Sequence, residues 1–301
     1  MDLLCDTGFK ILFGRESSMD ILIGFLNAVL DGEGLDPIVE LTYLDKEKCK
    51  ESPDERTIFY DIHCKTKSGH RFIVEMQNKP QSFFRERSIF YVARAITEQG
   101  EPGDWEYDFM PVYSIALTQF RLHPDEKRLR VDVMLKDMET NETFSKSIRL
   151  IYIQLPNFNI TTPEECRNDF EKWIFILKNL RDMETMPFVQ DIFRRVENVA
   201  RVENLSPEDR RSYERDLKFY RDYRNTLKFA EKEGLAQGMA QGMAQGMAQG
   251  MAQGMAQGVA KGKTESLREM VHSMSENGLD IDMIARIAKI GVSRVKEILG
   301  L

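Results

Sequence analysis

The sequence contains few residues of the types that form disulfide scaffolds or zinc sites. It has four cysteines and four histidines, and the cysteines, Cys5, Cys49, Cys64 and Cys166, form no C-x-x-C pair. A structural zinc site needs closely spaced cysteine and histidine ligands, and a disulfide scaffold needs a much higher density of cysteine. We therefore expect reduced thiols and neither kind of site.

Long apolar runs are also missing. No stretch of about 18 apolar residues occurs, so the sequence predicts no membrane-spanning helix. The N-terminal segment MDLLCDTGFKILFGRE carries an acidic residue early and has no extended apolar run, so we expect no signal peptide there. Together these observations favour a soluble, cytoplasmic protein without a membrane partner.

The charge balance excludes a third class of protein. Lys and Arg number 42 against 49 Asp and Glu, which gives a net charge of −7 and argues against a polycationic protein that coats nucleic acid. A nuclease with a local basic cleft remains compatible, because steering depends on where the charges lie. With 42% hydrophobic residues, 301 residues are enough to bury a substantial core, in about two domains.

The first half of the chain alternates helical and extended patterns. Apolar residues recur at helical spacing over 21–30, and a second amphipathic helix is predicted over 83–99. The β-rich runs are 38–44, 57–64, 71–76, 111–120, 129–135 and 147–155, and the Lys67-Ser68-Gly69 turn predicts a hairpin. Residues 1–160 are therefore expected to form one α/β core with a mixed sheet flanked by helices.

The pattern becomes helical from Pro163 onward. Apolar stripes run through 170–177 and 189–196, and Ser206 followed by Pro207 predicts the start of a helix that continues towards Ala230. We expect residues 161–233 to be a helical extension that packs on the core.

Residues 234–263 contain a short tandem repeat. From Ala236 to Lys263 the chain repeats seven tetrads of the form A-x-G-x, of which the first five are AQGM. Ala, Gln and Met favour a helix, whereas a glycine at every fourth position costs about 1 kcal/mol each relative to alanine. We interpret the segment as a spacer, helical at least in part and then spanning roughly 42 Å. The alternative is a homo-oligomerisation face lined by methionines at 239, 243, 247, 251 and 255.

The last segment, 264–301, is predicted to form a small helical tail. A helix, a turn containing Gly291 and a second helix have the layout of a helix-turn-helix. The alternative is a helical hairpin that packs within the chain or mediates dimerisation. Only Lys289, Arg294 and Lys296 lie in or beside the second helix, too few to predict DNA binding from charge.

The segments 59–64 and 71–78 contain the residues most suited to chemistry. Glu75 and Gln77 share one face of a strand because side chains alternate along it, and Asp61 lies on the preceding strand of the hairpin. Two converging carboxylates suit Mg²⁺, which prefers carboxylate oxygens and keeps several waters. Such an ion can activate water for attack on a phosphate.

At these residues the sequence resembles known nucleases. Asp61 followed by Glu75-x-Gln77 resembles the D…(D/E)-x-K core of the PD-(D/E)XK nuclease superfamily. Three further strings resemble the recombination-promoting nuclease (Rpn) family of transposase-like proteins: Asp6-Thr-Gly-Phe9-Lys10-x-x-Phe13, Val74-Glu75-Met76-Gln77 and Phe84-x-Glu-Arg87-x-x-x-Tyr91. The resemblance covers about residues 1–230.

The resemblance implies a restriction-endonuclease-like fold and a metal-dependent DNA endonuclease that hydrolyses phosphodiester bonds in recombination or mobile elements. It implies Asp61 and Glu75 as ligands of Mg²⁺ or another divalent cation, with Gln77 beside them. Gln77 stands where the superfamily usually has lysine; glutamine can orient water or a phosphate oxygen but cannot supply positive charge. A catalytically weak or inactive DNA-binding or assembly protein of the same fold is the alternative.

Five further residues are candidates around this centre. Lys79 has the same strand parity as Glu75, although Pro80 argues that the strand ends there, and Lys10 is the second candidate for the missing positive charge. Asp6 is either a third acid near the metal or the cap of the helix that contains Phe9 and Phe13. Arg87 and Tyr91 lie one helical turn apart, which suits contact with a DNA phosphate; the alternative is an arginine packed over a half-buried tyrosine.

Overall fold

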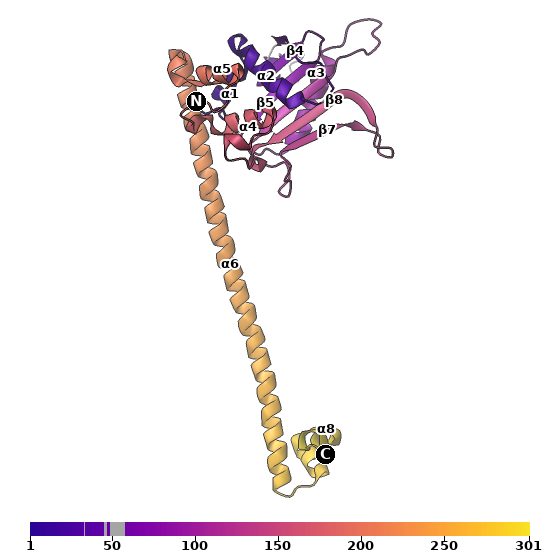
Figure 1. Ribbon diagram of the computed structural model, residues 1–301. Helices are drawn as coiled ribbons and strands as arrows, with labels where there is room; N and C mark the ends of the chain where they lie inside the picture. Colours follow the sequence, from indigo (N-terminus) through magenta and orange to yellow (C-terminus); the bar gives the residue numbers. More distant parts are fainter. Residues whose placement is uncertain (33, 45–46, 49–57) are drawn as a thin grey trace. The chain divides into compact units, whose positions relative to one another are not determined.

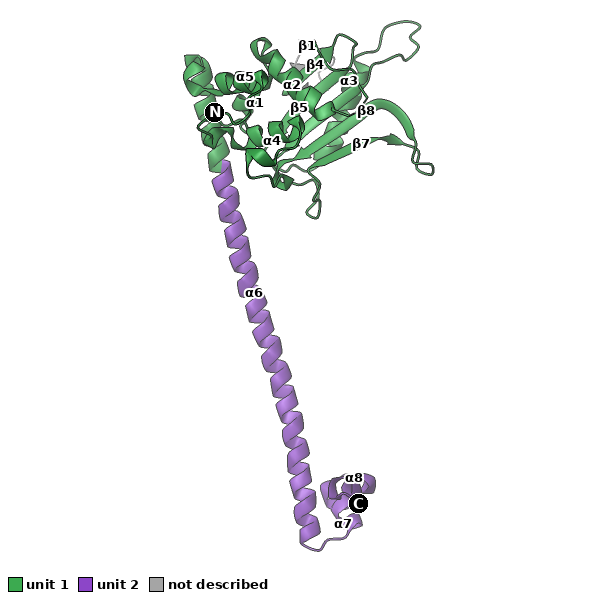
Figure 2. Cartoon of the chain, in the orientation of Figure 1, with its two compact units in different colours: residues 1–222 green, residues 223–301 purple. Residues whose placement is uncertain are grey.

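The computed structural model describes residues 1–32, 34–44, 47–48 and 58–301 (Figure 1). Cys49 and the first residue of the predicted strand 57–64 lie outside the described residues. The chain divides into two compact units, residues 1–222 and 223–301 (Figure 2). Cys5, Cys64 and Cys166 are free thiols.

Six strands of the first unit form one mixed sheet in the order β1-β4-β5-β6-β8-β7. Their bounds are β1 Leu41–Tyr43, β4 Ile62–Thr66, β5 Arg71–Gln77, β6 Val112–Thr118, β7 Arg130–Lys136 and β8 Thr143–Gln154. Strands β5, β6 and β8 are parallel, and the other neighbouring pairs are antiparallel. A separate antiparallel pair joins β2 Glu47–Lys48 to β3 Ile58–Phe59. The predicted α/β fold with a mixed sheet and flanking helices is confirmed.

Helices cover both faces of the sheet. The helices are α1 Asp6–Phe13, α2 Met19–Leu30, α3 Phe84–Thr97, α4 Asp169–Asn179 and α5 Asp191–Ala200. Buried residues of α1, α2, α4 and α5 share one core with Val74 and Met76, whereas buried residues of α3 pack with Ile73 on the opposite face. The alternation of strand β5 thus directs its even-numbered side chains to the larger core and its odd-numbered side chains towards α3.

The prediction of one continuous strand over 57–64 is wrong for the described part of that range. Strand β3 ends at Phe59 and β4 begins at Ile62, so Tyr60 and Asp61 lie between the two strands. The Oδ2 atom of Asp61 accepts the backbone N–H of Met76 at 3.1 Å. In a regular antiparallel ladder, this N–H would donate to a backbone carbonyl of the neighbouring strand. Here the side chain of Asp61 accepts it instead, and the pairing of β4 with β5 ends at Ile62 and Val74.

Helix α6 runs from Pro207 to Glu276 and contains the whole tandem repeat. The backbone N–H of Asp209 donates to Ser206 Oγ at 3.1 Å, which confirms the predicted start of this helix. The expectation that the repeat is helical is also confirmed, while its role as a spacer stays a prediction. None of the described helices combines the length and the apolar character needed to cross a membrane.

The end of α6 and two short helices form the tail. Helices α7 Ile281–Ala288 and α8 Val292–Leu299 enclose a small core with buried Val271, Ile284 and Val295. Lys289, in the left-handed region at φ 55°, ends α7, and Gly291 occupies the N-cap position of α8. The two short helices and their turn have the predicted layout, and DNA binding by the tail stays a prediction.

Candidate active site

Asp61 and Glu75 lie near each other where the β4–β5 hairpin opens. The last pair of the register is Ile62 with Val74, and Asp61 and Glu75 are the residues next to that pair at the open end of the hairpin. The two carboxyl groups are close enough for the charge of Asp61 to raise the pKa of Glu75. The side chain of Glu75 is 7% exposed and that of Asp61 is 19% exposed. The structure therefore brings the two predicted acids together at a nearly buried position.

Burial makes it costly for both acids to be ionised. Burial raises the pKa of Glu75 to about 7, the charge of Asp61 adds to the increase, and Arg87 opposes it. Burial also raises the pKa of Asp61, although Lys10 and the N–H of Met76 favour its charged form. Burial is thus the main reason that the ionised forms of the two acids are disfavoured, and a cation bound between them would favour those forms.

Lys10 supplies one positive charge from helix α1. Its Nζ atom lies 3.4 Å from Asp61 Oδ1 and 2.9 Å from Asp6 Oδ1. Burial lowers the pKa of Lys10, but the hydrogen bond with Asp6 and the charge of Asp61 outweigh burial, and the net shift is upward. Lys10 is therefore protonated at neutral pH and bridges Asp6 to Asp61.

The start of helix α1 fixes the position of Lys10. Cys5 is the N-cap, and its Sγ accepts the backbone N–H of Gly8 at 3.4 Å. A Cβ atom at Gly8 would lie 2.2 Å from the carbonyl oxygen of Asp2, so only glycine fits this approach. The alternative that Asp6 caps the helix is wrong: Asp6 is the first residue of the helix, and its carboxylate pairs with Lys10.

Gln77 and Lys79 differ in their relation to the acids. The Nε2 atom of Gln77 donates to Glu75 Oε2 at 3.3 Å, as expected for two residues on one face of a strand. Strand β5 ends at Gln77, and Lys79 lies in an exposed bend beyond it. The strand parity suggested for Lys79 therefore does not apply, and Lys10 is the lysine that contacts Asp61.

Arg87 reaches the acids from helix α3. Its Nη2 atom lies 3.9 Å from Glu75 Oε2, and its Nη1 atom donates to Gln81 Oε1. The guanidinium carbon lies 5.3 Å from the ring centre of Phe84 and 5.7 Å from that of Tyr91. Arg87 thus packs over the half-buried Tyr91, as the second alternative expected, and also lies beside Glu75, while contact with a DNA phosphate stays a prediction.

The Nε atom of Arg87 is a buried donor without a hydrogen-bond acceptor among the described residues. Burial raises the pKa of nearby Tyr91, and the charge of Glu75 adds to the increase. A buried N–H without an acceptor is costly, whereas the side chain of Arg87 as a whole is 29% exposed and can be approached from solvent. Gln81, which anchors Arg87, was not predicted because a single loop glutamine has no periodicity or motif.

The donor set fits a divalent cation held partly by the protein. Within residues 1–32, 34–44, 47–48 and 58–301, no three His, Cys, Asp or Glu side chains form a group that could hold a metal. Two carboxylates completed by water and substrate phosphate are a common arrangement for Mg²⁺. Asp61 and Glu75 could provide those two carboxylates, and a nearby cation would oppose the increase in their pKa that burial causes.

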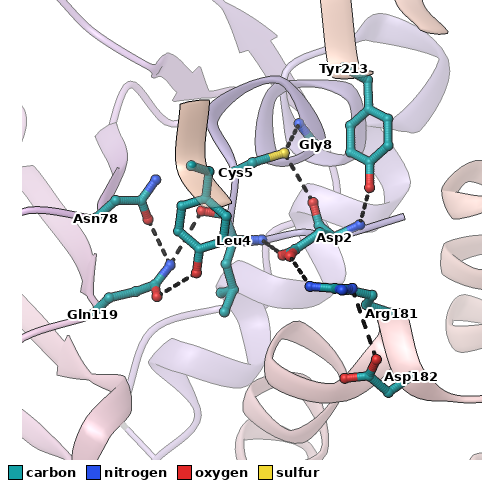
Figure 3. A network of polar contacts seen from close by, with 10 residues as sticks. Asp2, Leu4, Cys5, Gly8, Asn78, Gln119, Arg181, Asp182 and Tyr213 are labelled. Atoms are coloured by element: carbon teal, nitrogen blue, oxygen red, sulfur yellow. Dashed lines mark hydrogen bonds and ion pairs between the residues drawn. The ribbon is translucent and has the colours of Figure 1, made fainter. Parts of the chain in front are cut away.

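A polar network holds the segment before α1 against the end of β5 (Figure 3). Gln119 donates through Nε2 to Asn78 Oδ1 at 2.7 Å and to the carbonyl oxygen of Leu4 at 3.3 Å. The Tyr220 hydroxyl donates to Gln119 Oε1 at 2.7 Å, and the backbone N–H of Asp2 donates to the Tyr213 hydroxyl at 2.7 Å. The first turns of α6 thereby support the segment that leads to Lys10.

A comparison with protein-family models identifies the family of the chain. A family model described as PD-(D/E)XK nuclease family transposase matches residues 3–230. Searches of curated proteins and of solved structures give no match. The matched range includes both acids, Lys10, Gln77 and Arg87, and it confirms the resemblance seen in the sequence. The chain therefore belongs to the PD-(D/E)XK nuclease family of transposases.

Proposed function

We propose that the chain is a DNA endonuclease that hydrolyses phosphodiester bonds with the help of a divalent cation. The neighbouring, nearly buried carboxylates of Asp61 and Glu75 are the observation that carries this proposal. Lys10 and Arg87 lie on either side of the pair and provide cationic contacts for a polyanionic substrate. Family membership supports a nuclease or transposase-like activity.

Asp61 and Glu75 would hold the cation, which we expect to be Mg²⁺ or another divalent ion. When bound, such an ion lowers the pKa of water and stabilises negative charge on a phosphate. Asp61 is oriented by the N–H of Met76, and Glu75 by the amide of Gln77. We assign Gln77 the role of positioning a water or a phosphate oxygen next to Glu75.

Lys10 replaces the positive charge that Gln77 lacks. Its ammonium group is held between Asp6 and Asp61 and stays protonated at neutral pH. A fixed cation beside the acids can stabilise charge that develops on the phosphate during hydrolysis. Asp6 then acts as a positioning residue for Lys10, and Lys79 is not required.

Arg87 and Tyr91 are proposed to contact the DNA backbone. The side chain of Arg87 is 29% exposed, so a phosphate oxygen can approach its guanidinium group while that group stays beside Glu75 and Gln81. Stacking of the guanidinium over Phe84 and Tyr91 restricts its rotation. The family description supports an association with mobile elements or recombination.

Cleavage of supercoiled plasmid in Mg²⁺ tests this function. We expect Asp61→Asn and Glu75→Gln to reduce cleavage by at least about 100-fold, since each removes a ligand charge. EDTA should abolish cleavage in the wild type. Glu139→Gln makes the same chemical change at an exposed turn residue and should leave the rate unchanged.

Two outcomes of this experiment would contradict the proposal. Cleavage that persists in Glu75→Gln or in EDTA would exclude the assigned mechanism. DNA binding by the wild type without cleavage under any divalent cation would support the alternative, a catalytically inactive DNA-binding or assembly protein.

A further inference from the structure

The repeat segment of α6 is an exposed helix without charge. Every residue from 224 to 266 is exposed, and residues 234–260 contain no charged side chain. The methionines at 239, 243, 247, 251 and 255 are 68–78% exposed. The segment therefore combines full exposure with a regular series of methionines and no charge, and exposed apolar faces of this kind typically serve as interaction surfaces.

Packing within the described residues does not require the glycines of this helix. They recur at every fourth position from Gly234 to Gly262, and no atom of the described residues lies within 4 Å of a Cβ built at any of them. Each costs about 1 kcal/mol of helix stability relative to alanine. Glycine on a helix surface does allow the backbone of a second helix to approach closely, so a partner helix would give these residues a use.

The four-residue repeat gives this helix a face whose N-terminal and C-terminal halves contain different residue types. A helix turns about 100° per residue, so each four-residue repeat is rotated by about 40° relative to the repeat before it. A straight face along the helix therefore contains different positions of the repeat in successive turns. The face centred on Met247 contains, in chain order, Glu233, Ala236, Ala240, Met243, Met247, Met251, Gly254, Gly258 and Lys261. Along the chain, the alanines precede the central methionines and the glycines follow them. Glu233 lies at one end of the face and Lys261 at the other.

We propose that this face binds the same face of a second copy of the chain, with the two helices antiparallel and the two-fold axis at Met247. Ala240 then meets Gly254 of the second copy, and Ala236 meets its Gly258. The methionines pair with methionines at the centre. Each alanine methyl group faces a glycine, which permits close packing along both halves of the contact.

Charge selects the antiparallel orientation. In this register Glu233 lies opposite Lys261 of the second copy, and the symmetry repeats the pair at the other end. A parallel pair in register would instead place Glu233 against Glu233 and Lys261 against Lys261. Like charges in contact are destabilising, so the two ends favour the antiparallel pair over the parallel one.

Charge reversal in the full chain tests the interface and offers a matched control. Glu231 and Lys263 are two residues from Glu233 and Lys261, but about 160° around the helix from the centre of the face. Glu233→Lys and Lys261→Glu should each weaken self-association by about tenfold or more, measured by sedimentation equilibrium. The double variant should restore it, whereas Glu231→Lys should match the wild type.

Failure of this pattern would overturn the proposal. A wild type that remains monomeric over the accessible concentration range, or equal self-association in Glu233→Lys and Glu231→Lys, would each exclude the interface. All four positions are exposed, so these substitutions do not disturb a core.

Disulfide trapping tests the orientation separately. Full-length Ala240→Cys and Gly254→Cys proteins of different tag size are mixed and oxidised, with the wild type as control for the native cysteines. The antiparallel pair predicts that the mixed 240–254 dimer predominates. Predominance of the 240–240 and 254–254 dimers would show a parallel pair and contradict the proposal.

Discussion

The Nζ atom of Lys10, on helix α1, lies 3.4 Å from Oδ1 of Asp61, which directly precedes strand β4 at the open end of the β4–β5 hairpin. This contact joins the N-terminal motif to the pair of acids, although the two residues are far apart in the sequence. It places a protonated lysine beside the carboxylates even though Gln77 occupies the usual lysine position. The site therefore has a positive charge that comes from a different element of the fold.

Removal of Lys10 should reduce cleavage. We expect Lys10→Met to lower the rate of DNA cleavage by at least about 100-fold, because a charge that stabilises the reacting phosphate is lost. Adding Gln77→Lys to this variant should recover at least about tenfold, because a lysine there lies next to Glu75. Initial rates on plasmid DNA measure both effects. Lys79→Met is the control, and a larger loss in Lys79→Met than in Lys10→Met would contradict the assignment.

The pKa of Glu75 predicts a pH dependence of stability in metal-free protein. The folded-state pKa is about 7 against an ordinary value of 4.5, so the folded chain binds more protons than the unfolded chain between these values. The free energy of unfolding should therefore fall as pH rises from 4.5 to 7, by up to about 3 kcal/mol from this residue. Urea unfolding in EDTA across this range measures the change.

Glu75→Gln is the reference for that measurement. The amide does not titrate, so the variant should gain stability relative to the wild type as pH rises from 4.5 to 7. A difference between the two proteins that is constant with pH would show that Glu75 is not the group responsible.

The network around Gln119 predicts a contribution of α6 to the stability of the core. Tyr220→Phe removes the hydroxyl that donates to Gln119 Oε1 and leaves that acceptor unsatisfied at a position where Tyr220 is buried. We expect the free energy of unfolding to fall by about 1–2 kcal/mol. Tyr107→Phe, at an exposed tyrosine, is the matched control. Equal stability of the two variants would contradict the role assigned to this hydrogen bond.

Truncation separates the core from the rest of α6. A chain that ends at Gly234 keeps Tyr213 and Tyr220 and should unfold cooperatively and retain metal-dependent cleavage. A chain that ends at Leu205 loses both tyrosines and should be much less stable. Thermal unfolding and plasmid cleavage measure the two properties. Loss of cooperative unfolding in the longer truncation would show that the repeat and tail complete the core, contrary to the spacer interpretation.

Local patterns were sufficient to predict part of the site. Strand alternation correctly predicted that Glu75 and Gln77 share a face, since this periodicity follows from the backbone alone. The one-turn spacing of Arg87 and Tyr91 likewise predicted their contact on α3. Both predictions depend on residues within a single element.

Features of the site that depend on tertiary packing could not be predicted from the sequence. The choice between Lys10 and Lys79 required the packing of α1 beside the hairpin, and the cap of α1 proved to be the thiol of Cys5 rather than Asp6. The break at Asp61 arises because its carboxylate competes with the backbone for the N–H of Met76. Contacts of this kind depend on how helices and strands pack against one another, and local sequence propensities do not predict that packing.

Calorimetric titration with Mn²⁺ is the most direct test that Asp61 and Glu75 form one metal site. We expect the wild type to bind the ion with an affinity that increases with pH towards 7, as Glu75 loses its proton. Asp61→Asn and Glu75→Gln should each lose this binding, and Glu139→Gln should keep it. Binding by both site variants with the affinity of the wild type, or no binding by the wild type, would contradict the account.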